Sequence, residues 1–266
     1  MHDAVGTGSL VLTPVQRLGR SGLDALAALG RFGVFLAQAL GYLAVPPLKV
    51  GRALQRVWFI GFRSLLLIVL TGAFTGMVLG LQGMLMLQRV GSEAFVGPLV
   101  ALALVRELGP VLAALMVTGR AGSALAAELG VMRITEQIDA LTVMALNPMR
   151  YLVVPILVAG VVTVPLLTWV FDVVGVFGGY LVAVKLLGLS EGTYFGQIRA
   201  FLGATDLWVG FWKSLAFGVI VTWVACYKGF HVGHGAEGVG RATTEAVVLA
   251  SVLILVVDYF LGSVLP

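Results

Sequence analysis

The sequence is poor in charge. Asp, Glu, Lys and Arg make up only 11% of its 266 residues, while 59% are apolar and the mean hydropathy is +1.03. An ordinary soluble domain carries about 25% charged residues. Too few ionised side chains remain to cover a globular surface in water, so most of the surface must face a medium as apolar as the core. The composition excludes a water-soluble protein and predicts a membrane protein.

Several other features are scarce or absent. Cys226 is the single cysteine, so no disulfide can form within the chain. The net charge of +4 comes from 17 Lys and Arg residues spread along the sequence, without the basic runs and interleaved aromatics of a nucleic-acid surface. The pattern GxxxxGK[ST], whose backbone and lysine hold nucleotide phosphates, does not occur.

Long apolar runs dominate what is present. A helix needs about 20 mainly apolar residues to cross a bilayer core about 30 Å thick. Five runs qualify: Val57–Leu87, Ala94–Thr118, Leu152–Leu187, Leu207–Tyr227 and Thr244–Leu265. The sequence therefore predicts an all-α membrane protein with five transmembrane helices, in a transmembrane domain covering residues 57–266.

The N-terminal region, residues 1–56, has a different character. Its apolar stretch from Val15 to Val45 is interrupted by arginines and an aspartate, and it ends at Pro46 and Pro47. We expect an amphipathic helix that lies at the membrane surface, with arginines toward the headgroups. A sixth spanning helix that tolerates an arginine is the alternative.

Basic residues predict the orientation. Short loops rich in Lys and Arg stay cytoplasmic. Eleven such residues lie before span one, between spans two and three, or between spans four and five, against about three on the opposite side. We expect a cytoplasmic N-terminus and a C-terminus on the opposite side of the membrane. An odd number of spans without an internal repeat favours a pathway between two copies of the chain.

Glycines recur in span one at Gly72, Gly76 and Gly80, a spacing of four that puts them on one helix face. Such a stripe is typical of close helix packing, within or between protomers. Lining a lipid path is the alternative.

The segment between spans two and three, residues 119–141, predicts a short amphipathic cytoplasmic helix. Its charged and polar residues suit a surface that docks another protein, although a solvated connector would have a similar pattern. We select five candidates for the docking surface: Glu128, Arg133, Glu136, Gln137 and Asp139.

Charged residues inside the spans are candidates for a transport pathway, because exposure to lipid costs at least about 2.5 kcal/mol each. They are Arg106, Glu107, Lys213 and Asp258. We place Lys213 and Asp258 about 9 Å from the outer span ends, where they could pair, and Arg106 and Glu107 about 18 Å deep. In one hypothesis Arg106 and Lys213 attract a lipid phosphate, the carboxylates set their positions, and Leu79 and Leu255 hold acyl chains. In the other, the four charges only neutralise each other.

Several motifs together resemble the MlaE family of permeases, which belong to the Mla phospholipid transport system. They extend from about Ile60 to Asp258, and no single one is specific. The sequence reads RELGP at 106–110, TGRAGSA at 118–124, ELGVMR at 128–133 and EQ at 136–137, with further matches at 76–83, 147–150, 178–179, 213–214 and 241–244.

The resemblance implies a homodimeric permease subunit of an ABC transporter that moves glycerophospholipid. Each protomer would dock a cytoplasmic ATPase, which would bind ATP and Mg, through the helix between spans two and three. The dimer would lie beneath a periplasmic hexamer of MCE domains, and a STAS-domain protein could accompany the ATPase. The resemblance implies a role in outer-membrane lipid asymmetry in Gram-negative bacteria, and no cofactor or catalytic residue in this chain.

Other functions have weaker support. A protease would need Ser123 to meet His231 or His234, but Ser123 lies at a span end and both histidines are in a glycine-rich loop. The two histidines also make a poor metal-ligand set, and we expect no metal site. An ion-coupled secondary transporter of an amphipathic solute, or a scaffold subunit that only anchors other proteins, are the remaining alternatives.

Overall fold

The computed structural model describes residues 8–43, 50–233 and 235–265, and every regular element within them is a helix. The α-helices are α1 (Gly8–Leu43), α2 (Val50–Gln88), α3 (Val96–Ala103), α4 (Gly109–Val117), α5 (Ser123–Ile134), α6 (Gln137–Val143), α7 (Val154–Tyr180), α8 (Glu191–Phe201), α9 (Ala204–Phe230) and α10 (Gly235–Val264). π-Helical segments lie at Leu104–Leu108, Thr118–Gly122, Met149–Val153 and Leu181–Leu186, and a 3-10 turn lies at Glu93–Phe95.

The chain separates into two compact units, Met1–Pro46 and Pro47–Pro266. In the first unit, α1 is one helix of 36 residues, and its apolar part, Leu29–Leu43, is shorter than a bilayer crossing requires. The N-terminal helix is confirmed, whereas Val45, Pro46 and Pro47 at its expected end lie outside the described residues. In the second unit, α2 begins at Val50, so residue 56 lies inside a helix and not at its start.

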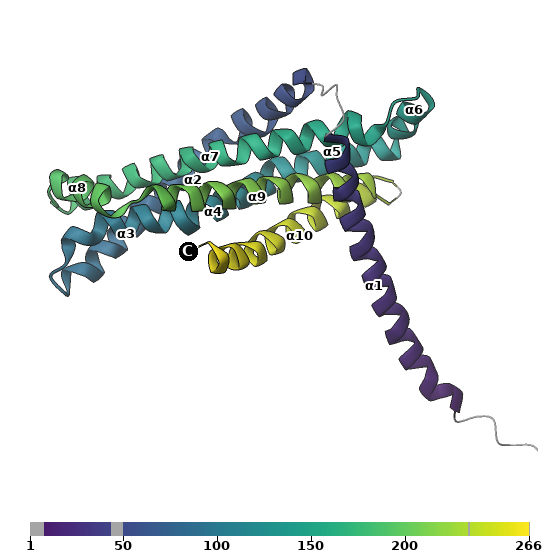
Figure 1. Ribbon diagram of the computed structural model, residues 1–266, viewed down its shortest axis with the longest axis horizontal. Helices are drawn as coiled ribbons and strands as arrows, with labels where there is room; N and C mark the ends of the chain where they lie inside the picture. The colour runs from purple at the N-terminus through teal and green to yellow at the C-terminus, as the bar shows by residue number, and fades with distance from the viewer. Residues whose placement is uncertain (1–7, 44–49, 234, 266) are drawn as a thin grey trace, which may run out of the picture. The chain divides into compact units, whose positions relative to one another are not determined.

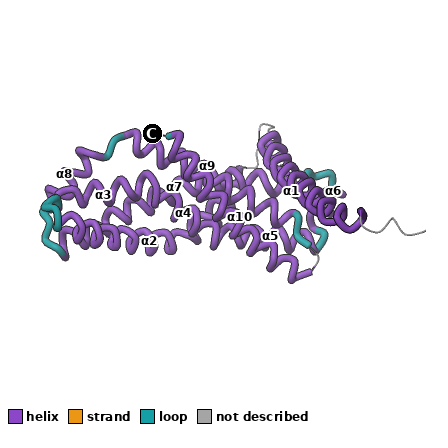
Figure 2. Tube along the Cα trace, turned by 90° about the horizontal axis from the view of Figure 1, so that it is seen from below, coloured by secondary structure: helices purple, strands orange, loops and turns teal. Residues whose placement is uncertain are grey.

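Five helices in the described part of the chain are long and apolar enough to cross a membrane, as predicted. They are Val50–Gln88, Glu93–Ile134, Met149–Leu186, Ala204–Phe230 and Gly235–Val264. Span two is much longer than expected, because the π-helical turns join α3, α4 and α5 without a loop. Figure 1 and Figure 2 show the helices of this unit running side by side, with α6 and α8 at opposite ends.

Glycines allow α2 and α7 to pack closely. A methyl group on Gly76 would overlap the backbone of Gly175, and one on Gly80 would lie 2.9 Å from the carbonyl oxygen of Gly179. A methyl group on Gly72 would lie 3.0 Å from the Phe171 carbonyl oxygen. The glycine stripe of span one therefore faces span three of the same chain.

Helix α8 was not expected from the sequence, which placed Arg199 in a loop. Tyr194 fixes it against α7: the side chain is fully buried, and its hydroxyl donates to the carbonyl oxygen of Val176 at 3.1 Å. Burial raises the pKa of Tyr194, so the phenol remains a neutral donor. Helix α8 ends at Phe201, and the extended backbone of Leu202 and Gly203 leads into α9. A helical break therefore separates α8 from span four.

Candidate functional site

Lys213 is the centre of a cluster of charges inside the bundle. Its Nζ lies 2.5 Å from Oε2 of Glu107 and 3.0 Å from Oδ1 of Asp258, so α9 is joined to both span two and α10. The Lys213 side chain has no exposed surface, whereas that of Glu107 is 49% exposed. The sequence-based pairing of Lys213 with Asp258 is present in the structure, and Glu107 joins it.

Arg106 belongs to a second pair, with a residue that sequence reasoning missed. Its Nη1 lies 2.9 Å from Oδ1 of Asp206, and the other oxygen of Asp206 accepts a hydrogen bond from the backbone N–H of Gly203 at 2.9 Å. Asp206 therefore caps the start of α9 and holds Arg106 at the same time. The spacing Gly203-x-x-Asp206 before an apolar run was the available signal, since an acidic residue at this position commonly caps a helix.

The π-helical turn Leu104–Leu108 presents Arg106 and Glu107 to partners on the same neighbouring helix, α9. Such turns are found frequently at functional sites. The expectation that Glu107 lies about 9 Å deeper than Lys213 is wrong, because the backbone of Gly210 lies against the carbonyl oxygen of Val105, which brings Glu107 and Lys213 to nearly the same level. The depths were counted as if the two spans began at one level, whereas Glu107 lies 14 residues after the start of span two and Lys213 nine after the start of α9.

The two apolar candidates lie on different helices of the bundle. Leu255 is 55% exposed on α10, three residues before Asp258 and therefore on the same helix face. Leu79 is partly buried on α2 beside Gly80. Contact of either side chain with lipid stays a prediction.

The expected docking helix is two helices. Helix α5 continues span two to Ile134, and α6 follows after Glu136, which has a positive φ of 58°. Arg133 bridges the two, with its Nη1 2.7 Å from Oδ1 of Asp139. Both of these side chains are exposed, and Gln137 donates to the hydroxyl of Thr135 at 3.0 Å.

Glu128 has a different environment from the other docking candidates. Its two carboxylate oxygens accept hydrogen bonds from Arg56 of α2 at 2.6 and 2.8 Å. This bidentate pair attaches α5 to α2, so Glu128 contributes to the junction of the helices. The exposed candidates for docking are then those around the turn between α5 and α6.

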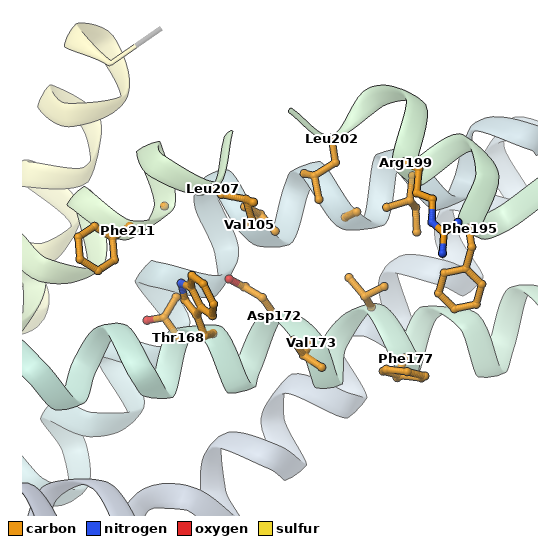
Figure 3. A pocket seen from close by; sticks show the side chains of 15 residues that line it. Val105, Thr168, Asp172, Val173, Phe177, Phe195, Arg199, Leu202, Leu207 and Phe211 are labelled. Carbon is orange, nitrogen blue, oxygen red and sulfur yellow. The ribbon is translucent and has the colours of Figure 1, made fainter. Parts of the chain in front are cut away.

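A cleft lies between span two, α7, α8 and the start of α9, and sequence reasoning missed it. Its volume is about 420 Å³, and most of its walls are apolar. Asp172 of α7 and Arg199 of α8 are the two charged residues that line it, and Figure 3 shows Asp172 between the Thr168 end and the Arg199 end. Asp172 stands alone within a long apolar run, a signal that the search for intramembrane charges could have found.

The side chains of Ser123 and His231 each contact a backbone carbonyl oxygen of their own helix. The hydroxyl of Ser123 donates to the carbonyl oxygen of Gly119 at 2.5 Å. The Nδ1 of His231 lies 2.9 Å from the carbonyl oxygen of Tyr227. His234 lies outside the described residues, among which no three His, Cys, Asp or Glu side chains group to hold a metal ion.

Comparison with known proteins gives the family. A family profile described as "Permease MlaE" matches residues 53–264, which include all five spans except the first residues of α2. The chain belongs to the MlaE permease family. This MlaE-family chain is 39% identical over 259 residues to the intermembrane phospholipid transport system permease protein MlaE of Haemophilus influenzae. The match covers 96% of the chain and 98% of that relative.

Two further relatives of the MlaE-family chain come from distant sources. It is 40% identical over 252 residues to a "Probable ABC transporter permease protein" of Rickettsia bellii, with 95% of the chain and 97% of the relative covered. It is 36% identical over 210 residues to the chloroplastic protein TRIGALACTOSYLDIACYLGLYCEROL 1 of Arabidopsis thaliana. The match covers 79% of the chain and 60% of that relative. The relatives therefore extend from bacteria to a plant organelle.

Proposed function

We propose that this permease moves glycerophospholipid between the bacterial inner membrane and a periplasmic MCE-domain hexamer, as a homodimer driven by a separate cytoplasmic ATPase. The ATPase would bind ATP and Mg, and a STAS-domain protein could accompany it. The N-terminus would be cytoplasmic and the C-terminus periplasmic, and the transport would maintain outer-membrane lipid asymmetry. The permease chain itself would have no catalytic role.

The observation that carries this proposal is the charged cluster. Charges inside a bilayer are costly unless they pair or face a wet cavity, and such residues commonly mark a substrate pathway. Here Lys213 is fully buried and pairs with two carboxylates, whereas the side chains of Glu107 and Arg106 remain partly exposed. The name of the Haemophilus influenzae relative points to phospholipid as the substrate, and a lipid brings both a phosphate and acyl chains.

The exposed fraction of each charge suggests a division of roles. The Arg106 side chain is 36% exposed, so a phosphate could reach its guanidinium while Asp206 still holds it. Lys213 already neutralises two carboxylates, which favours a role in positioning Glu107. The apolar surface beside the cluster, with Leu255 on α10 and Leu79 on α2, would contact the acyl chains.

The unequal burial of the spans supports a second copy of the chain as partner. In the most apolar part of span three and of span four, 67% of the residues are buried, whereas the value for α10 is 11%. The exposed face of α10 is apolar and includes Val248, Val252 and Leu255. A dimer would cover this face and bring two charged clusters toward one central path.

Arg106 gives the sharpest test. We expect Arg106→Met to lower lipid transport by about tenfold or more in the assembled complex, because a charge-assisted hydrogen bond to phosphate is lost. Asp206→Asn is the matched control, since it weakens the same ion pair but leaves the guanidinium available. Transport is measured between vesicles and the purified periplasmic partner, and assembly by copurification.

The two variants give distinct results. Loss of transport in Arg106→Met with retention in Asp206→Asn supports phosphate contact by Arg106. Equal loss in both would assign the pair a structural role only. Normal transport in a well-assembled Arg106→Met complex would contradict the proposed pathway.

A further inference from the structure

The cleft beside α8 is built by the helical break between α8 and α9. Leu202 and Gly203 are extended at this point, so the two helices do not continue one another. Leu202 and Leu207 line the cleft from either side of the break, and Phe211 lies one turn farther along α9. Figure 3 shows these side chains above those of α7. At about 420 Å³, the space is large enough for a small ligand or part of a lipid.

The length of the cleft can be followed along α7. Its lining on this helix runs from Thr168 to Phe177, which is about 14 Å at 1.5 Å per residue. Trp169, Val173 and Val176 lie between them, so this wall is mainly apolar. An extended acyl chain fits such an apolar channel, and acyl chains are the apolar material that surrounds a membrane-spanning bundle.

Arg199 gives the cleft a polar end. Arg199 is exposed at the end beside Phe195 and Phe177 (Figure 3). Asp172 lies five residues before Phe177 on α7, about 7.5 Å farther along the helix axis. Its Oδ1 is buried against Gly109 and has no hydrogen-bond partner among the described residues. This oxygen is packed against Gly109 and not against the cleft, so Arg199 at the exposed end is the charged group available to a ligand.

We propose that this cleft binds one glycerophospholipid in each protomer, with the phosphate at Arg199 and one acyl chain along α7 toward Thr168 and Phe211. An exposed cation at one end of an apolar cleft matches a lipid, whose phosphate lies at one end of its acyl chains. This site is separate from the Lys213 cluster and takes only its substrate class from the proposed function.

Photo-crosslinking in the complete complex tests the site. A benzophenone amino acid is placed at Val173, inside the cleft, or at Val162, which is exposed on the same helix outside it. The complex is reconstituted in vesicles of phosphatidylethanolamine and phosphatidylglycerol that contain a radiolabelled phosphatidylethanolamine. We expect saturable lipid labelling at Val173 and only weak, non-saturable labelling at Val162.

Two variants identify the contacts. We expect Arg199→Ala to weaken saturable labelling at Val173 about tenfold, because a charge-assisted contact is lost, and Arg199→Lys to restore part of it. Arg89→Ala, which removes an exposed arginine outside the cleft, is the control and should have no effect. Val176→Trp should fill the cleft and abolish labelling while the complex still copurifies.

Equal labelling at Val173 and Val162, independent of Arg199, would overturn the site and show only bilayer lipid around the protein. Crosslinking of Val173 to a partner protein in place of lipid would also overturn it. The proposed function has a separate readout: the site fails alone if transport is normal but labelling is absent. The proposed function fails alone if labelling is saturable but the wild-type complex moves no lipid.

Discussion

At the residue scale, Lys213 shows how the fold accommodates a charge inside the helix bundle, where an unpaired charge would be unfavourable. Its side chain is fully enclosed and reaches two carboxylates on two other helices. Gly262 of α10 leaves space beside it, since a methyl group there would lie 3.4 Å from Nζ. Removal of one member of such a buried group leaves the others uncompensated.

We therefore predict that Lys213→Met destabilises the protein by about 3 to 5 kcal/mol, because Glu107 and Asp258 would remain close together without a cation. Denaturation of the purified protein in detergent measures the change. Addition of Glu107→Gln and Asp258→Asn should recover most of the lost stability, since it removes the uncompensated charges. A single Lys213→Met variant as stable as the wild type would show that the cluster carries little of the folding energy.

The sequence predicted the pairing at Lys213 because intramembrane charges seek partners and few candidates exist. It could not predict Arg106 with Asp206, since Asp206 precedes the apolar run and was counted outside the span. Asp172 was missed for a different reason, because one acidic residue in a long run hardly changes the average polarity. The depths failed because they assumed that spans two and four begin at the same level, which the sequence does not determine.

At the scale of elements, the contact of α2 with α7 depends on backbones that approach without side chains between them. In a membrane such packing is a main source of helix association, because lipid tails are as apolar as the side chains. The recurrence of glycine at every fourth residue predicted a packing face. It could not predict the partner helix, because Gly175 and Gly179 of span three become matched to Gly76 and Gly80 only in the folded chain.

Gly76 gives the prediction at this scale. Gly76→Ala would place a methyl group into the Gly175 carbonyl, so we expect overpacking that costs about 1 to 3 kcal/mol. Gly51→Ala is the control on the same helix, because a methyl group there meets nothing within 4 Å. Alanine at Gly51 should leave stability unchanged or raise it by up to about 1 kcal/mol. Equal effects of the two substitutions on the denaturation midpoint would contradict the close contact.

At the scale of the whole molecule, the turn between α5 and α6 is where the permease would transmit force from its ATPase. The amphipathic pattern predicted helix on both sides of this turn but not the turn itself, since Glu136 has ordinary helix propensity and still adopts a positive φ. The turn exposes Arg133, Glu136 and Asp139 together.

We predict that Glu136→Arg releases the ATPase from the purified complex, because loss of a desolvated charge pair at an interface costs about 2 to 5 kcal/mol. This variant leaves the pair of Arg133 with Asp139 intact, whereas Arg133→Glu changes both the surface and the pair. Glu237→Arg is the control, an exposed charge reversal at the start of α10. Wild-type ATPase copurification and transport in both Glu136→Arg and Arg133→Glu would show that this turn is not the docking surface.

The π-helical turn at Leu104–Leu108 also has a meaning for the history of the family. A π turn holds one residue more than the α-helical turn it replaces, so its natural origin is a single inserted codon. Deletion of that codon would rotate the rest of span two by about 100° relative to its first part. Arg106 and Glu107 would then be separated from their partners. Family members that have lost the charged cluster should therefore align to this chain with a one-residue gap at 104–108, and those that keep it should align without one.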